Sequence, residues 1–296
     1  MHEGQLNVDA ELVASLVAAQ FPRYAGAPVR RVHSGGTVNA IFRIGSDVAA
    51  RLPLLPADAA ELEAEASALN EFAETCPFPA PRALGIGAPD AAYPSAWTLQ
   101  EWLPGTVADP FRWSSSYALA DDVVSLIRRL RSAPVAGRSF DGRGRGGNLR
   151  DHDEWMAHCL AQSAGIVDTA AVEALWSVLR DLAADGEDRM SHRDLIPANL
   201  LVADGRLVGV LDGGAFGPAD PSLDLVAAWH LFDEPVRSHV RAAVGAGEAE
   251  WLRGAAWALQ QAMGLVWYYP ETNPPMAELG HSTVTRLLAD TELPRR

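Results

Sequence analysis

The spacing of apolar residues changes along the chain. Residues 9–21 carry apolar side chains three and four positions apart, which predicts a first helix. Short β-type runs bounded by turn residues follow at residues 29–33, 40–44, 48–52, 83–87 and 97–102. The alanine- and glutamate-rich residues 57–74 interrupt this series as a helix. The first hundred residues therefore predict a small sheet that begins as an antiparallel meander, together with two helices.

Helical spacing dominates after residue 104. The predicted helices occupy residues 117–131, 154–162, 170–183, 222–232, 236–244, 249–268 and 277–290. One strand pair, at 200–203 and 207–211, is joined by the hairpin signal Asp204-Gly205, and the glycine- and arginine-rich residues 137–147 form a loop. We expect an α+β, bilobal fold with an N-terminal lobe over residues 1–103 and a mostly helical C-terminal lobe over 104–296.

Charge narrows the choice of ligand. The 296 residues are 48% hydrophobic, enough for a sizeable core, and the net charge is −14. All 24 basic residues are arginine. The acidic balance argues against nucleic acid or a membrane surface as a partner and favours a cationic ligand. Without lysine, any nucleotide phosphate has to be bound by arginine.

The chain carries no signal for export or membrane insertion. No apolar run approaches the roughly 20 residues of a membrane-spanning helix, and residues 1–4 do not begin a signal peptide. We therefore expect a cytoplasmic protein, a monomer or weak dimer, in which Cys76 and Cys159 are reduced thiols.

One segment has a spacing typical of phosphoryl transfer. His192, Asp194 and Asn199 form an H-x-D-x-x-x-x-N pattern directly before the predicted hairpin, whose second strand ends at Asp212. Phosphoryl transfer to a hydroxyl needs a carboxylate that orients the hydroxyl and accepts its proton, and oxygen ligands that hold Mg²⁺. Because the hairpin returns the chain to its start, Asp194, Asn199 and Asp212 form a predicted phosphotransferase set.

These residues resemble the aminoglycoside phosphotransferase family, protein-kinase-like small-molecule kinases that include the macrolide phosphotransferases. The matching segments are residues 34–40 (SGGTVNA), 50–53 (ARLP), 62–65 (LEAE), 212–225 (DGGAFGPADPSLDL) and 268–274 (YYPETNP). The resemblance covers roughly residues 10–290. It implies a protein-kinase-like fold for the whole chain, with a small β-sheet lobe and a larger helical lobe.

The resemblance also implies roles for individual residues. Asp194 would be the catalytic base, and Asn199 and Asp212 would bind Mg²⁺. Arg51, paired with Glu65 or alternatively with Glu61 or Glu63, would hold the α and β phosphates of ATP or GTP. Further nucleotide contacts would come from a glycine turn over the phosphates and from a hinge at residues 100–103 that reads the purine, represented by Gly35, Gly36, Thr37, Gln100 and Trp102.

Two residues near Asp212 add expectations of their own. Gly213 follows Asp212 where the family carries an apolar side chain, so we expect a more mobile loop there. Asp224, further along the same segment, is expected to brace the helix that starts at Pro221.

The acceptor is the least constrained part of the prediction. The acidic balance favours a cationic hydroxyl compound, an aminoglycoside or a macrolide with its sugar amine. Glu271, in the late proline-rich loop, is the first candidate to bind it, followed by Asp153 and Asp233. The same catalytic residues suit an amino-alcohol such as choline or homoserine. A nucleotide-binding pseudokinase is the alternative without activity, and the complete catalytic set argues against it.

Overall fold

The computed structural model of the chain describes residues 6–32, 38–184 and 186–294. The chain divides into two compact units. The first comprises Met1–Glu74, Pro79–Pro104 and Leu211–Ala215, and the second comprises Thr75–Phe78, Gly105–Val210 and Phe216–Arg296. A single boundary after residue 103 therefore does not describe the division, because the short stretch that contains Asp212 belongs to the first unit.

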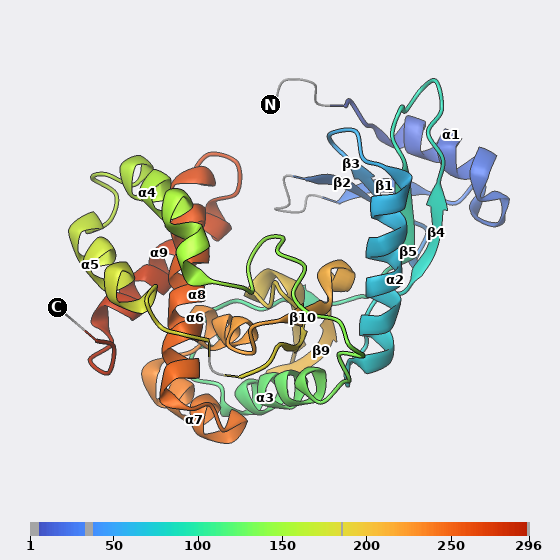
Figure 1. The fold of residues 1–296 in the computed structure, drawn as a ribbon. Helices are drawn as coiled ribbons and strands as arrows, with labels where there is room; N and C mark the ends of the chain where they lie inside the picture. Colours follow the sequence, from blue (N-terminus) through green and yellow to red (C-terminus); the bar gives the residue numbers. More distant parts are fainter. Residues whose placement is uncertain (1–5, 33–37, 185, 295–296) are drawn as a thin grey trace. The chain divides into compact units, whose positions relative to one another are not determined.

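The first unit is built on a five-stranded antiparallel sheet (Figure 1). Its strand order is β1-β2-β3-β5-β4, with β1 at Val29–Val32, β2 at Asn39–Ile44, β3 at Val48–Pro53, β5 at Trp97–Glu101 and β4 at Ala83–Gly87. Every second side chain of β2 is buried, as expected for a sheet with one covered face. The helices are α1 (Ala10–Gln20), whose apolar stripe joins this core, and α2 (Ala59–Thr75).

Helix α8 (Glu248–Tyr268) lies at the centre of the second unit (Figure 1). The helices that pack on it are α4 (Asp153–Gln162), α5 (Thr169–Leu179), α6 (Val226–Leu231) and α9 (Pro274–Ala289). Its buried alanines present small side chains to these neighbours on several sides. Helices α3 (Tyr117–Arg131) and α7 (Glu234–Val244) pack against each other in the same unit.

The second unit also contains short strands. The predicted hairpin is present as β8 (Leu200–Ala203) and β9 (Arg206–Val210), and its turn residues Asp204 and Gly205 have φ of +51° and +74°. Three strands of two or three residues were too short to give a periodic pattern: β6 (Thr106–Val107), β7 (Arg189–Ser191) and β10 (Gly217–Ala219). The structure confirms the predicted α+β class.

Two predicted helices are shorter than expected. The helix predicted at 170–183 ends at Leu179, and the helix predicted at 222–232 is a 3-10 turn over Leu223–Leu225 followed by α6. Within the described ranges, no helix combines the length and the apolar character needed to cross a bilayer.

Candidate active site

The loop that carries Asp194 is fixed from below by a buried carboxylate. Asp224, 1% exposed, accepts hydrogen bonds from the Ser191 hydroxyl (2.8 Å) and from the backbone N–H groups of His192 (3.0 Å) and Arg193 (3.2 Å). Arg193 has φ of +70°, a left-handed conformation that costs a side-chain-bearing residue about 1–2 kcal/mol. Asp224 therefore holds the catalytic loop in a strained conformation. The sequence predicted for Asp224 only that it braces the start of a helix, and not that it binds this loop.

The two oxygens of the Asp194 carboxylate have different surroundings. Oδ1 accepts hydrogen bonds from Arg145 Nη2 and from Gln261 Nε2, both at 2.7 Å. Oδ2 accepts a longer bond of 3.2 Å from Asn199 Nδ2. The side chain is 31% exposed. Oδ1 is thus the anchored oxygen, and Oδ2 is the oxygen with capacity for a substrate hydroxyl.

Gln261 is itself oriented by a chain of hydrogen bonds. Because a carboxylate only accepts, Gln261 directs its NH₂ group at Asp194, and its Oε1 accepts from His230 Nε2 at 3.1 Å. His230 Nδ1 lies 2.8 Å from the Thr283 hydroxyl oxygen, which is also 2.9 Å from the Leu279 carbonyl. Complete burial lowers the pKa of His230 to about 4, which keeps the ring neutral at pH 7. This chain runs through the core of the second unit to Asp194.

Asn199 presents an oxygen that nothing else in the described residues binds. Its Nδ2 donates to the Asp194 backbone carbonyl at 2.9 Å as well as to the carboxylate. This orientation leaves Oδ1 open for the predicted Mg²⁺. The described residues contain no group of three or more His, Cys, Asp or Glu that could hold a metal.

In the first unit, the ion-pair partner of Arg51 is Asp212 and not Glu65. Arg51 Nη1 donates to Asp212 Oδ1 at 2.7 Å, and no ion pair joins Arg51 to Glu65. The pairing of Arg51 with Glu65 over bound phosphates therefore stays a prediction. Burial raises the pKa of Glu65, the Arg51 charge opposes this rise, and the Asp212 charge adds to it. Asp212 is the stronger partner because its carboxylate, 43% exposed, loses less hydration in the pair.

Gly213 is required by packing. A Cβ at this position would lie 2.3 Å from Phe72 Cδ1, so the buried Phe72 ring of α2 fills the space of the apolar side chain found here in the family. A Cβ at Gly214 would meet its nearest neighbour, Glu65 Cβ, at an ordinary 3.6 Å. We therefore attribute Gly213 to a close helix contact and not, as expected from the sequence, to loop mobility.

The predicted nucleotide contacts are described only in part. Gly35, Gly36 and Thr37 lie outside the described residues. In the predicted hinge, Gln100 lies within β5 and is paired with strands on both sides, while Trp102 donates its backbone N–H to the Asp47 carbonyl at 2.8 Å. Within residues 100–103 as described, Leu103 is the residue without a backbone hydrogen bond. A purine-reading role for this segment stays a prediction, and Leu103 is better placed for it than Trp102.

The three acidic candidates for the acceptor also differ. Asp153 forms an ion pair with Arg180, and Asp233 accepts from the Ser114 hydroxyl at 3.0 Å. These internal partners argue against a role of either carboxylate in acceptor binding. Glu271 is exposed and makes no hydrogen bond or ion pair with the described residues, so its role stays a prediction.

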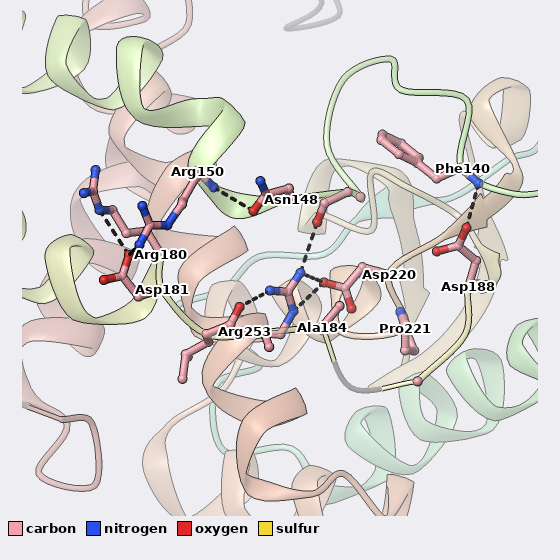
Figure 2. Close-up of a pocket in the computed structure, with 15 residues that line it drawn as sticks. Phe140, Asn148, Arg150, Arg180, Asp181, Ala184, Asp188, Asp220, Pro221 and Arg253 are labelled. Carbon is pink, nitrogen blue, oxygen red and sulfur yellow. Dashed lines mark hydrogen bonds and ion pairs between the residues drawn. The ribbon is translucent and has the colours of Figure 1, made fainter.

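A separate cavity of about 480 Å³ lies within the second unit (Figure 2). In its wall Arg253, 2% exposed, binds Asp220 and the backbone carbonyls of Leu182 and Gly147. The other arginines of the wall are also paired, Arg150 for example with an aspartate at 3.0 Å. Asp194 and Asn199 are not part of this cavity. It marks the polar cluster that anchors the glycine- and arginine-rich loop.

Comparison with known proteins defines the class of protein. Residues 29–257 match the phosphotransferase enzyme family, and the chain belongs to this family. The resemblance predicted from the motifs is thus confirmed. Aminoglycoside 3'-phosphotransferases of Escherichia coli and Salmonella typhimurium are each 29% identical to the chain over 175 residues. These matches cover 56% of this chain and 62% of each relative, less than two thirds of their length.

Solved structures extend the likeness to nearly the whole chain. The GDP and kanamycin complex of APH(2")-IIia has a TM-score of 0.71 at 17% identity, over 95% of this chain and 99% of that one. The apoenzyme of macrolide 2'-phosphotransferase MphH from Brachybacterium faecium has a TM-score of 0.57 at 18% identity, over 93% and 97%. At these identities the likeness establishes the fold, which confirms the predicted protein-kinase-like fold.

Proposed function

We propose that the protein is a Mg²⁺-dependent phosphotransferase that moves the γ-phosphoryl group of ATP or GTP to a hydroxyl of an aminoglycoside or macrolide antibiotic. The observation that carries this proposal is the Asp194 carboxylate, 31% exposed, in which Oδ1 accepts from two donors at 2.7 Å and Oδ2 only a longer bond from Asn199. A carboxylate held in this way orients a hydroxyl and accepts its proton. Membership of the phosphotransferase family and the names of the curated relatives support it.

Nucleotide and metal binding follow from three side chains. The accessible Asp212 carboxylate and Asn199 Oδ1 are oxygen ligands of the kind that Mg²⁺ prefers, and bound Mg²⁺ neutralises phosphate charge during transfer. The Arg51 guanidinium matches phosphate oxygens in a fork. Arg51 and Mg²⁺ are alternative cations for Asp212, so we expect Arg51 to turn from Asp212 to the phosphates when Mg²⁺ and nucleotide bind. Related structures contain GDP, ADP or ATP, so both purines belong in the test.

The surroundings of α8 favour a ring-containing cationic acceptor over an amino-alcohol. From Gln261, which holds the base, α8 continues for about 10 Å to Tyr268 at 1.5 Å per residue, and the loop with Glu271 follows. Trp155 packs on Gly264 along this path, and the Trp155 and Tyr268 rings are 41% and 37% exposed. The exposed Trp155 and Tyr268 rings suit the rings of an acceptor, and the Glu271 carboxylate suits its amine.

A direct transfer assay tests the proposal. The purified protein is incubated with Mg²⁺ and γ-labelled ATP or GTP, and with kanamycin, gentamicin, streptomycin, a macrolide, choline or homoserine. Asp194→Asn serves as the matched control. We expect labelled antibiotic with the wild type and at least 10²-fold less with Asp194→Asn. Transfer to an amino-alcohol in preference to both antibiotic classes would establish the alternative. Nucleotide binding without transfer to any acceptor would establish the pseudokinase.

Salt dependence distinguishes the two antibiotic classes. The Debye screening length shortens from about 10 Å at 0.1 M salt to about 3 Å at 1 M salt, and this weakens ion pairs that are exposed to solvent. We expect the KM of a polycationic aminoglycoside to rise steeply with sodium chloride while kcat changes little, and the KM of a singly charged macrolide to rise less. Glu271→Gln should raise KM and flatten the slope, whereas Glu173→Gln, the same charge change on α5, should not. A KM independent of salt would contradict binding by charge.

A further inference from the structure

The catalytic loop brings no cation of its own to the base. Residues 195–198, between Asp194 and Asn199, are apolar, and the chain contains no lysine. The neighbouring Arg193 side chain is bound to Asp141 at 2.9 Å and to the Arg143 carbonyl. The cation at Asp194 comes instead from Arg145, about 50 residues earlier, whose Nη2 lies 2.7 Å from Asp194 Oδ1.

The loop that carries Arg145 is held at both ends. At its start, the Phe140 N–H donates to Asp188 at 2.7 Å. Directly after Arg145, the Gly146 carbonyl accepts from the Asp220 N–H at 2.8 Å, and the next carbonyl accepts from Arg253 at 3.0 Å (Figure 2). The buried pair of Arg253 and Asp220 in the cavity wall thus fixes the backbone next to Arg145. The position of this guanidinium is built into the fold of the second unit.

The Arg145 guanidinium has donors that Asp194 does not use. Its side chain is 28% exposed. Its Nη1 group donates to no group in the described part of the chain, and its Nε–H, which is buried, has no hydrogen-bond partner there either. An arginine presents its donors as a planar fork that matches phosphate oxygens, and a buried donor without a partner is costly to leave unmatched.

We propose that Arg145 is a catalytic residue that binds the phosphoryl group as it is transferred to the hydroxyl held by Asp194; this rests on the proposed function. The acceptor oxygen forms a bond to the γ-phosphorus, and the bond from that phosphorus to the β,γ-bridging oxygen breaks. The bonding electron pair leaves with the nucleoside diphosphate, and the hydroxyl proton moves to Asp194 Oδ2. During this step negative charge spreads over the equatorial oxygens, where a fixed guanidinium stabilises it.

Kinetics of charge-removing variants give the first test. Arg145→Gln should lower kcat by 10²–10³-fold, the range for loss of one positioned donor, with little change in the KM of the acceptor. Arg145→Lys should recover part of the loss, and added guanidinium should raise the kcat of Arg145→Ala. Arg143→Gln, the same change two residues earlier on an exposed side chain, should leave kcat within about threefold. A kcat of Arg145→Gln equal to or above the wild-type value overturns the proposal.

A binding measurement separates contact with the phosphoryl group from an effect on Asp194 alone. ADP, Mg²⁺ and aluminium fluoride, which mimics the phosphoryl group in transfer, are titrated in the presence of the acceptor. The two variants compared are Asp194→Asn and the double variant Asp194→Asn/Arg145→Gln. The double variant removes both charges of the ion pair, so neither partner is left as an unpaired charge that would hinder folding. The double variant should bind the mimic at least tenfold more weakly than Asp194→Asn, with ADP affinity unchanged. Equal affinity for the mimic would show that Arg145 acts only through the base and would overturn the proposal.

The two proposals fail in different ways. A wild type that transfers phosphate, together with an Arg145→Gln variant that transfers it equally well, contradicts only the role of Arg145. A wild type that transfers phosphate to no acceptor contradicts the proposed function, and the role of Arg145 with it.

Discussion

Asp194 and Asp212 are the two carboxylates on which the proposed reaction depends, and they are held in different ways. Asp194 follows a residue in the left-handed conformation, Arg193 with φ of +70°, and Asp212 has this conformation itself, with φ of +61°. Asp194 is surrounded by donors of the second unit, and Asp224 locks the loop beneath it. Asp212 faces the charge of an arginine that is itself partly exposed. A base must keep its orientation throughout the reaction, whereas a metal ligand must be able to exchange one cation for another.

The largest expected effects are on turnover. Asp212→Ala should abolish activity at every Mg²⁺ concentration and weaken Mg²⁺-dependent nucleotide binding, because the metal loses its charged oxygen. Asp194→Asn should lower kcat by about 10²–10⁴ and leave nucleotide affinity unchanged, because only proton acceptance is lost. Steady-state kinetics and nucleotide titrations over a Mg²⁺ series measure both. Near-normal turnover of either variant, or equal loss of nucleotide affinity in both, would contradict the assigned roles.

The next effect concerns how rigidly each site is built. Asp224→Ala leaves three donors of the catalytic loop without their buried partner and should reduce the free energy of unfolding by about 3 kcal/mol or more. Arg51→Ala removes a partly exposed ion pair and should reduce it by less than about 1 kcal/mol, although nucleotide binding weakens. Urea unfolding of both variants measures the difference. Similar losses in both would mean that the two carboxylates are held alike.

Acid should weaken the second unit through His230. Burial lowers its pKa from 6.5 to about 4, so the unfolded chain binds a proton between these values that the folded protein excludes. The free energy of unfolding should therefore fall as the pH drops from 6.5 to 4, by a contribution of order 3 kcal/mol. In His230→Gln this contribution is absent, so its stability should depend less on pH over the same range. Parallel curves for the two proteins would show that His230 is not the group responsible.

The smallest effect tests the packing of the Asp212 segment. Gly213→Ala places a Cβ 2.3 Å from the Phe72 ring and should cost about 1–3 kcal/mol of stability. Gly214→Ala meets its neighbours at ordinary distance and is the matched control. Phe72→Leu, combined with Gly213→Ala, should recover part of the loss. If the two alanine variants unfold alike, Gly213 is not needed for this contact.

Much of the fold could be predicted because a long segment with regularly spaced apolar residues indicates its own secondary structure. The predicted bounds of residues 117–131 are those of α3, since its apolar stripe and the capping Ser116 mark both face and start. The helix predicted at 222–232 was wrong in its first turn, where Asp224 is drawn into hydrogen bonds with a loop more than 30 residues earlier. No local pattern records such a distant partner.

The same limit applies to the site. The motif selected Asp194, Asn199 and Asp212 as candidates because their spacing is local, whereas the ion pair of Arg51 with Asp212, 161 residues away, was not expected. Gln261 and Arg145 were missed. Gln261 is one polar residue on a buried helix face, and Arg145 lies in a loop without periodicity. The absence of lysine pointed to arginine as the residue that binds nucleotide phosphate, but it did not indicate Arg145.

The discontinuity of the first unit sets an order for its completion during synthesis. Its last stretch, Leu211–Ala215, emerges about 110 residues after Pro104, which at 5–20 residues per second takes roughly 5–20 s. Throughout this interval the nascent sheet has neither Asp212 nor the Gly213 backbone that packs on Phe72. A fragment that ends at Pro104 would lack the same two elements permanently. The first unit therefore gains its proposed metal ligand only after more than half of the second unit has been synthesised.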